Sequence, residues 1–465
     1  MERRARWYGW SVVIASWLAV FCLFGYRATF AILKGPMGTA LGWSASQVTL
    51  GYSLMMVCYA VTAYFSGLML DRWGARPVYA GAAVLGSLGF ILTARVDTHL
   101  AYLVTFGLLG GVATGLLWVT STVSVRQWYV GKTYATMWGV AFAGAPVAQF
   151  VLAQMVRPRL GAAQRALEQA VIAAVGADVA ALAPPDLARL IADALVDPAV
   201  RASVAVAPAL QALDAAWRSQ MTLLGVLVLA ALALAALAAR RRPEQYELQP
   251  FGSLKGAPAV EYEWRVGDAF ARYAIWGAIL TFLTSMMAEF LIWTQVVSYW
   301  TDDVGYSLQQ ATGIYAIIGL IGIASMPLMG RVADWVVQAV GHEARGRKIM
   351  LLVGPSTGAV ACILLLVSGR LALAYAACFV FAVYWAIVPG GVVGYVGATY
   401  GSRTLGKIWG LATLIVMGIG PFAGSFIGGL LRDLSGNYTL SIYYALGSFV
   451  VSTLLAASLP LKVDP

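Results

Sequence analysis

The sequence predicts an all-α integral membrane protein with twelve transmembrane helices in two halves of six, and three observations carry this prediction. The 465-residue chain is 60% hydrophobic and only 11% charged, whereas a soluble domain has about 25% charged residues because its surface faces water. Apolar runs of roughly 20 residues recur along the chain, and at about 1.5 Å of rise per residue each run can cross about 30 Å of hydrocarbon. A charged motif also recurs after the second and the eighth run, which indicates that a six-helix unit occurs twice.

The predicted spans divide evenly around a charged connector. Basic residues give their orientation, because loops that stay in the cytoplasm collect lysine and arginine. With the N-terminus inside, the inner segments hold 20 basic residues and the short outer loops hold four, so both termini are predicted to be cytoplasmic. The predicted spans are residues 7–33, 46–70, 77–94, 100–125, 134–156 and 219–239 in the first half, and 273–300, 309–329, 349–367, 371–397, 408–431 and 441–459 in the second.

Two segments interrupt this pattern and define the domain boundaries. One begins with three arginines and a proline, and we expect it to be a cytoplasmic linker between the halves. The other is alanine-rich, lies outside by the predicted topology and has apolar residues at helical spacing, so we expect amphipathic helices in it. We interpret this insertion as a surface cap that packs on itself, with a lid or a partner-docking element as the alternative. The expected organisation is the first five helices in 1–157, the insertion in 158–218, the sixth helix in 219–239, the linker in 240–268 and the second half in 269–465.

Composition argues against several other classes of function. The net charge of +10 has an ordinary cause in basic cytoplasmic loops, so no nucleic-acid partner is expected. The four cysteines lie in apolar runs without paired spacing and the two histidines fall in loops, so we expect no disulfide, no metal and no other cofactor. Residues 401–407 have the glycine and lysine spacing of a phosphate-binding loop, but Ile408 replaces the required serine or threonine. Since no catalytic constellation is apparent, the protein is predicted not to be an enzyme.

The recurring charged motif lies between the second and third predicted helices. It reads Gly-Leu-Met-Leu-Asp-Arg-Trp-Gly-Ala-Arg over residues 67–76, and a shorter copy over 330–334 places its aspartate 263 residues after the first. Glycine lets two helices approach closely, and aspartate can accept hydrogen bonds from a neighbouring helix N-terminus and pair with arginines. We therefore expect a latch that closes the cytoplasmic side in one conformation, with an ordinary loop of mixed charge as the alternative. The expected latch residues are Gly67, Asp71, Arg72, Gly74, Arg76, Gly330, Arg331 and Asp334.

The motif and its repeat resemble the cytoplasmic signature of the major facilitator superfamily. The resemblance covers essentially the whole chain except the insertion, and it implies a major facilitator fold with the substrate near the middle of the membrane, between the halves. It further implies a secondary transporter that moves a small organic anion, most simply a monocarboxylate, by alternating access with proton coupling. The compact loops fit a bacterial inner membrane. The stretches similar to the monocarboxylate and oxalate/formate branch are 8–10, 30–36, 41–44, 126–129 and 139–144.

Two charged residues lie inside predicted spans, where a charge costs at least about 2.5 kcal/mol and usually has a function. Arg27 stands in the first span at a position where the resembled branch carries a cation, and its guanidinium could hold a carboxylate through two hydrogen bonds. Glu289 stands near the middle of the seventh span at a similar depth, so the two could pair across the cavity and Glu289 could carry a coupled proton. The alternatives are an arginine that reaches outer-leaflet water and a purely structural carboxylate.

The resemblance implies further substrate contacts on helices that line the cavity in this fold, although ordinary helix packing would explain each aromatic residue equally well. Residues 313–329 carry no charge, and the resembled branch has its best-known substrate cation on this eighth span, so one carboxylate is favoured over two. Two other functions stay open, namely proton-coupled transport of a neutral or cationic solute through Glu289, and a transport-inactive sensor. The candidate substrate residues are Arg27, Tyr59, Trp118, Gln295, Tyr384 and Trp385.

Overall fold

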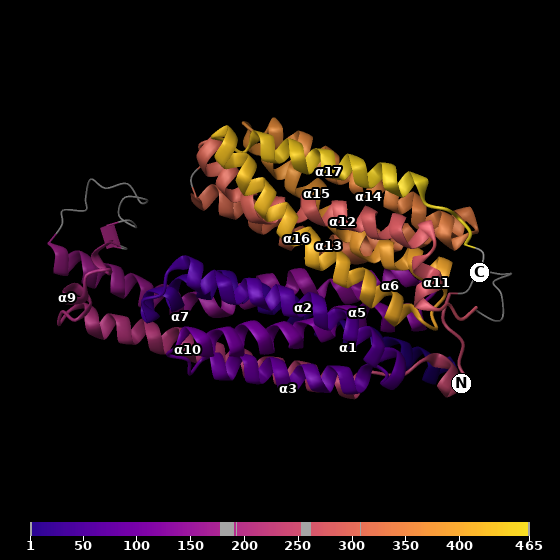
Figure 1. The fold of residues 1–465 in the computed structure, drawn as a ribbon, viewed down its shortest axis with the longest axis horizontal. Helices are drawn as coiled ribbons and strands as arrows, with labels where there is room; N and C mark the ends of the chain where they lie inside the picture. Colours follow the sequence, from indigo (N-terminus) through magenta and orange to yellow (C-terminus); the bar gives the residue numbers. More distant parts are fainter. Residues whose placement is uncertain (1, 177–189, 192, 253–261, 307, 464–465) are drawn as a thin grey trace.

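The computed structural model describes residues 2–176, 190–191, 193–252, 262–306 and 308–463, and most of them are helical (Figure 1). The first half contains α1 (Glu2–Leu41), α2 (Ala45–Trp73), α3 (Ala75–Thr93), α4 (His99–Tyr102), the π-helix η1 (Leu103–Leu109), α5 (Gly110–Trp128), α6 (Tyr134–Phe142), α7 (Gly144–Val175), α9 (Pro198–Arg201) and α10 (Val206–Ala238). The linker and second half contain η2 (Pro243–Tyr246), α11 (Val266–Phe270), α12 (Tyr273–Ser298), η3 (Tyr299–Asp303), α13 (Leu308–Val340), α14 (Glu343–Leu366), α15 (Leu371–Tyr400), α16 (Leu405–Ser435) and α17 (Thr439–Ser458).

Twelve helical segments in the described ranges are long and apolar enough to cross a membrane, which confirms the predicted all-α fold. The fourth span is built from α4, η1 and α5 in succession, and the fifth begins with α6 and continues in α7. The first span differs from expectation at its end. The span was expected to end at residue 33, but α1 continues through Pro36 to Leu41. The turn that follows needs Gly42, whose φ of 70° is in the left-handed region.

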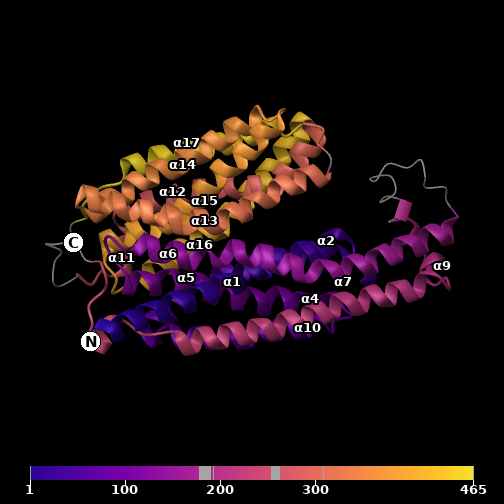
Figure 2. The same cartoon turned by 180° about the vertical axis from the view of Figure 1, so that it is seen from behind.

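The twelve spans form two bundles that lie side by side (Figure 1). Both chain termini lie at one end of the molecule, which we call the terminal end, and α9 lies at the opposite end, which we call the insertion end. The two halves are in contact at the terminal end and diverge toward the insertion end, as the front and back views agree (Figures 1 and 2). The main contacts between the halves pair α2 with α16 and α6 with α13.

Glycines make these two contacts between the halves unusually close. A Cβ atom added at Gly67 of α2 would collide with the carbonyl oxygen of Gly406 on α16. One added at Gly330 of α13 would collide with the carbonyl oxygen of Ala135 on α6. Both glycines belong to the recurring motif, so the motif supplies the small residue at each closest approach of the two halves.

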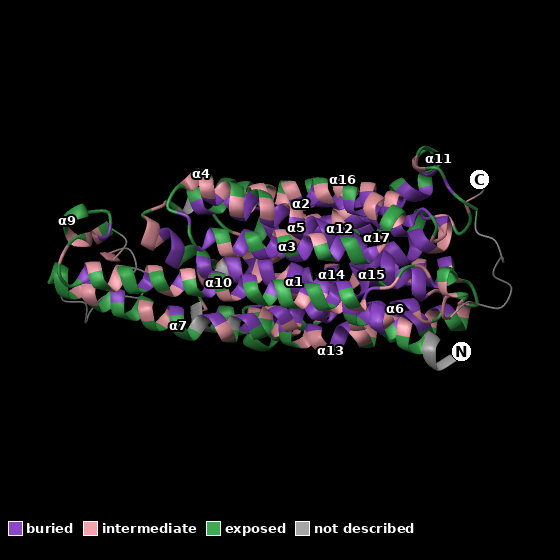
Figure 3. Ribbon diagram, turned by 90° about the horizontal axis from the view of Figure 1, so that it is seen from below, coloured by how far each residue is buried: buried purple, intermediate pink, exposed green. Residues whose placement is uncertain are grey.

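The described ends of the insertion are continuous with the membrane helices. The fifth span continues as α7 past the expected boundary at residue 157 to Val175, and the sixth begins at Val206 within α10. Their projecting ends are mostly exposed or half-buried (Figure 3). Arg201 of α9 donates hydrogen bonds to the carbonyl oxygens of Thr39 and Ala40, at 3.2 and 3.0 Å, and so covers the C-terminal end of α1. The first part of the expected amphipathic pattern, residues 177–189, lies outside the described residues.

Candidate functional site

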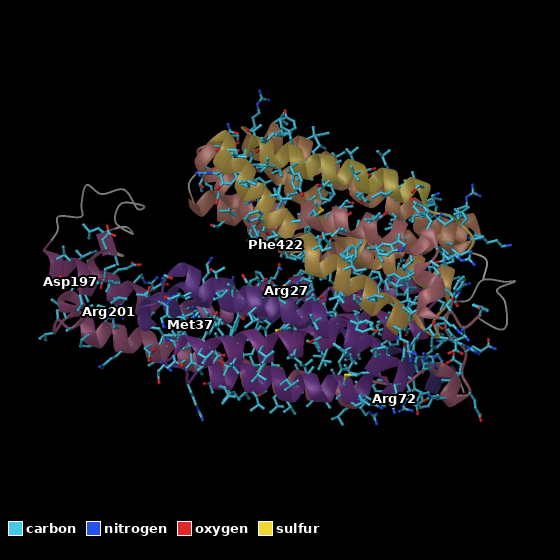
Figure 4. The ribbon with its side chains drawn as sticks, in the orientation of Figure 1. Arg27, Met37, Arg72, Asp197, Arg201 and Phe422 are labelled. Carbon is cyan, nitrogen blue, oxygen red and sulfur yellow. The ribbon has the colours of Figure 1, made fainter. Side chains whose placement is uncertain are left out.

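Arg27 lies on α1 near the boundary between the halves (Figure 4). Its guanidinium carbon is 4.8 Å from the centre of the Tyr59 ring on α2 and 5.4 Å from that of Phe24, one turn earlier on α1. The Nε and Nη2 atoms are buried and have no hydrogen-bond partner. A buried donor normally has a partner, so the environment of these two atoms is unusual.

Glu289 lies on α12 in the second half and is 6% exposed. Its Oε2 atom accepts a hydrogen bond from the Tyr384 hydroxyl of α15 at 2.9 Å, and the same hydroxyl lies 3.2 Å from the carbonyl oxygen of Ser285. Glu289 lies within electrostatic range of Arg27 in the other half, but the two form no ion pair in this conformation. The predicted pairing is therefore absent here, and each charged group keeps its own set of neighbours.

Aromatic rings fill the space between the two charged groups. The centre of the Trp385 ring on α15 is 6.1 Å from that of Phe24 and 5.7 Å from that of Phe142, both in the first half. It is also 5.2 Å from the ring of Trp293 on α12, which lies beside Glu289. Trp385 thus contacts both halves at the level of the two charged groups.

The structure brings together most of the predicted substrate residues, and two stand apart. Trp118 packs on Trp138 and Phe142 inside the first half, with ring centres 5.7 and 5.8 Å away. Gln295 follows Glu289 along α12 and donates to the carbonyl oxygen of Ser425 on α16 at 3.1 Å.

Five aromatic residues near the site were missed by the sequence prediction. Phe24, Phe142 and Trp293 contact Trp385. The ring of Tyr315 lies 5.4 Å from that of Trp293, and Tyr52 lies within electrostatic range of Arg27.

Helical spacing could have found two of those missed residues. Phe24 precedes Arg27 by three residues on α1, and Trp293 follows Glu289 by four residues on α12. Residues three or four apart lie on the same face of a helix. The others come from different helices, so no local spacing indicates them.

The shorter copy of the recurring motif forms a buried charge cluster at the terminal end. Asp334 of α13 accepts hydrogen bonds from the backbone N–H groups of Ala135 and Thr136, at 3.0 and 2.7 Å, at the N-terminus of α6. It also pairs with Arg347 of α14 at 2.9 Å. Beside this pair, Arg126 of α5 binds Glu343 at 2.5 Å. The Arg126–Glu343 pair joins the two halves, whereas Asp334 and Arg347 both belong to the second half and Asp334 reaches the first half through its two backbone hydrogen bonds.

The fuller copy of the motif makes fewer contacts. Asp71 of α2 accepts a hydrogen bond from the backbone N–H of Lys407 at 3.0 Å, at the N-terminus of α16. Its ion pair with Arg242 of the linker is longer, at 3.4 Å, and the Arg242 guanidinium also donates to the carbonyl oxygen of Arg403. The two aspartates therefore occupy equivalent positions in the two halves but differ in the strength of their contacts.

Apart from Gly67 and Gly330, the remaining predicted latch residues contact their own half or no partner in the described ranges. Arg72 stacks on Trp73, with its guanidinium carbon 5.7 Å from the ring centre. Arg76 donates to backbone carbonyls at the C-terminal end of α10, and Gly74 has a φ of 82° at the turn into α3. Arg331 is exposed. The sequence prediction named neither Arg126 nor Glu343 for the latch, although both stand at the end of an apolar span, where a charge can reach a neighbouring loop.

The described residues thus form a two-bundle membrane protein with twelve helices that can span a membrane. Charged groups lie between the bundles, and an equivalent aspartate from each half contacts the other half. The family model of the Major Facilitator Superfamily matches residues 16–155 and 160–425, and the chain belongs to this superfamily.

The curated relatives are consistent with this family, but each match covers only part of the relative's length. The chain is 26% identical over 120 residues to "Uncharacterized MFS-type transporter YhjX" of Escherichia coli (strain K12), covering 26% of this chain and 30% of the relative. It is 26% identical over 141 residues to "Probable anion transporter 2, chloroplastic" of Oryza sativa subsp. japonica (30% and 26% covered). It is 24% identical over 141 residues to "Monocarboxylate transporter 2" of Mus musculus (30% and 29% covered). The chain thus spans less than a third of the length of each of these transporters.

Solved structures share the fold over nearly the whole chain. The transporter FucP in the outward conformation matches with a TM-score of 0.66 and 12% identity, covering 96% of this chain and 98% of FucP. The proton:xylose symporter XylE matches with a TM-score of 0.59 and 14% identity, covering 97% and 96%. These likenesses support the major facilitator fold that the recurring motif implied.

Proposed function

We propose that this protein is a secondary transporter that moves a small organic anion, a monocarboxylate, by alternating access with proton coupling. The observation that carries the proposal is the Arg27 guanidinium, which presents two buried and unpartnered N–H-bearing atoms at the boundary between the halves. A planar guanidinium matches a carboxylate through two parallel hydrogen bonds. The apolar rings of Phe24 and Trp385 suit the remainder of a small organic acid.

In this proposal the terminal end faces the cytoplasm of a bacterial cell and the insertion end faces outside. Contact between the halves at the terminal end, with divergence at the insertion end, then corresponds to an outward-facing conformation. The contacts of Asp71 and Asp334 with the opposite half support a latch that holds the cytoplasmic side closed. Release of both contacts would accompany the inward-facing step.

A ligand screen tests the substrate class. A ligand that binds only the folded state raises its melting temperature, so purified wild-type protein is heated with small monocarboxylates, dicarboxylates, amines and neutral solutes at acidic and neutral pH. We expect a rise with monocarboxylates and little change with the other classes. A rise with amines or neutral solutes alone would favour the second candidate, which is transport of a cationic or neutral solute at Glu289. The burial of that carboxylate without a basic partner in the described ranges favours this alternative.

Glu289 is the proposed proton carrier, and its hydrogen bonds suit both of its protonation states. As a carboxylate it accepts from Tyr384; when protonated it can donate to the Tyr384 oxygen, while that hydroxyl donates to Ser285. We expect Glu289→Gln to abolish uphill uptake driven by a proton gradient and to keep substrate exchange within a few fold. Uptake into proteoliposomes measures transport driven by the proton gradient, and counterflow measures substrate exchange. Uphill uptake by Glu289→Gln at the wild-type level would exclude Glu289 as the proton carrier.

A further inference from the structure

The two helices that receive the aspartates share an unusual N-terminus. The residue before α6 is Thr133 and the residue before α16 is Thr404, and neither threonine side chain accepts a hydrogen bond from its own helix. Their backbone angles are similar, with φ −130° and ψ −15° at Thr133 and φ −112° and ψ 14° at Thr404. A capping threonine has an extended backbone and accepts from the second or third N–H of the helix, so both threonines are turned away from the capping conformation.

At other helices of the same protein, a serine or threonine before the first residue adopts the capping conformation. Ser44 before α2, with ψ 157°, accepts from the backbone of Gln47. Thr98 before α4, with ψ 145°, accepts from the backbone of Ala101. The lack of side-chain capping by Thr133 and Thr404 therefore occurs at the two helices that form the contact between the halves.

Aspartates of the opposite half occupy the positions that the threonines would fill. Asp334 accepts from Ala135 and Thr136, which are the second and third residues of α6. Asp71 accepts from Lys407, the third residue of α16. The Thr404 hydroxyl is consequently left without a hydrogen-bond partner although the residue is only 7% exposed.

We propose that Thr133 and Thr404 are positioning residues that replace the aspartates as N-terminal caps of α6 and α16 when the halves separate at the terminal end. This inference rests on the proposed alternating-access function. Separation removes each aspartate and leaves N–H groups at a helix N-terminus unsatisfied. Rotation of one ψ angle to the extended region brings the threonine hydroxyl to the same N–H groups. The exchange stabilises the inward-facing state, which would otherwise contain two uncapped helices.

The two threonine hydroxyls differ in the contacts that they must break before they can cap their helices. The Thr133 hydroxyl already donates to the carbonyl oxygen of Phe251 at 2.8 Å, and Phe251 pairs with the loop that precedes α6. Capping by Thr133 therefore requires this linker contact to break or rearrange. Thr404 has no such contact, and for this reason it is the better residue to test.

The test measures the distance between spin labels on the exposed positions Ala80 and Arg345, one in each half, without substrate. An N-terminal cap contributes about a fivefold preference, so we expect Thr404→Val to lower the ratio of open to closed terminal end about fivefold. Thr404→Ser should keep the wild-type ratio because it retains the hydroxyl. Thr133→Val combined with Thr404→Val should lower the ratio further, but by less than another fivefold, because Thr133→Val also removes the hydrogen bond to Phe251.

The Asp71→Ala background distinguishes capping from a merely structural role. Without Asp71, the Thr404 hydroxyl can cap α16 in both conformations, so Thr404→Val should no longer shift the ratio. An equal shift in both backgrounds, no shift in the wild-type background, or Thr404→Ser behaving like Thr404→Val would overturn the proposal. Melting temperatures check that each variant is folded, and Thr133→Val provides the second site if Thr404→Val does not fold. A single distance population in the wild-type protein under all conditions would instead count against alternating access itself.

Discussion

Arg27→Gln is expected to lower monocarboxylate affinity by at least about thirtyfold, because removal of one partner of a buried charge pair costs about 2–5 kcal/mol. Glutamine can donate hydrogen bonds but supplies no charge and no parallel pair of N–H groups. Arg27→Lys should keep part of the affinity, since it retains the charge without the planar geometry. Isothermal titration with the monocarboxylate that gives the largest thermal shift measures all three proteins.

The unliganded Arg27→Gln protein supplies an internal check. Since Nε and Nη2 of Arg27 are buried without partners, their loss should leave the melting temperature of the ligand-free protein unchanged or slightly higher. Arg370→Gln is the matched control, because it removes the same charge from an exposed position away from the candidate site. Wild-type affinity in Arg27→Gln, together with loss of binding in Glu289→Gln, would contradict the anion proposal and favour a cationic or neutral solute.

Asp334→Ala is expected to open the terminal end far more than Asp71→Ala does. Asp334 accepts two backbone hydrogen bonds across the boundary and pairs with Arg347, whose side chain is 1% exposed. A hydrogen bond to a charged group contributes about 1.5–3 kcal/mol. The two that cross the boundary are lost only from the closed conformation, whereas the pair with Arg347 lies within the second half. Asp71 accepts one backbone hydrogen bond from Lys407 at 3.0 Å and has a longer ion pair, so its removal should shift the equilibrium less.

The same spin-label distance across the terminal end measures this shift. Asp97→Asn is the control, because Asp97 forms an ion pair with Arg218 near the insertion end and its side chain is 82% exposed. An exposed ion pair contributes at most about 1 kcal/mol, so this control should leave the distance distribution unchanged. A shift by Asp71→Ala as large as that by Asp334→Ala would contradict the energetic ranking.

The sequence indicated what the aspartates of the two motif copies contact, but it did not indicate which copy makes the stronger contacts. It predicted that each aspartate would receive a helix N-terminus, and Asp71 and Asp334 do so. It ranked neither copy of the motif above the other, whereas in the structure the shorter copy makes the more extensive contacts. The reason is that the N-terminus of α6, which donates two N–H groups to Asp334, lies 199 and 198 residues away in the sequence. No spacing within the motif carries that information.

Local composition and periodicity determined the class of this protein. A twelve-span helical fold follows from apolar runs, because each backbone in a membrane must satisfy its own hydrogen bonds within a helix. The two intramembrane charges, Arg27 and Glu289, could be found for the same reason, since a charge is rare where it is costly. The repeat of the motif likewise revealed the two halves.

Tertiary structure alone decided which side chains meet between the halves. It separated Gln295 from the charged pair, placed Trp385 against both halves, and joined the insertion to α1 through Arg201. It also turned Thr133 and Thr404 away from their own helices. These outcomes depend on how helices distant in sequence pack against one another, whereas a sequence pattern reports only the face and the depth that each residue occupies along its own helix.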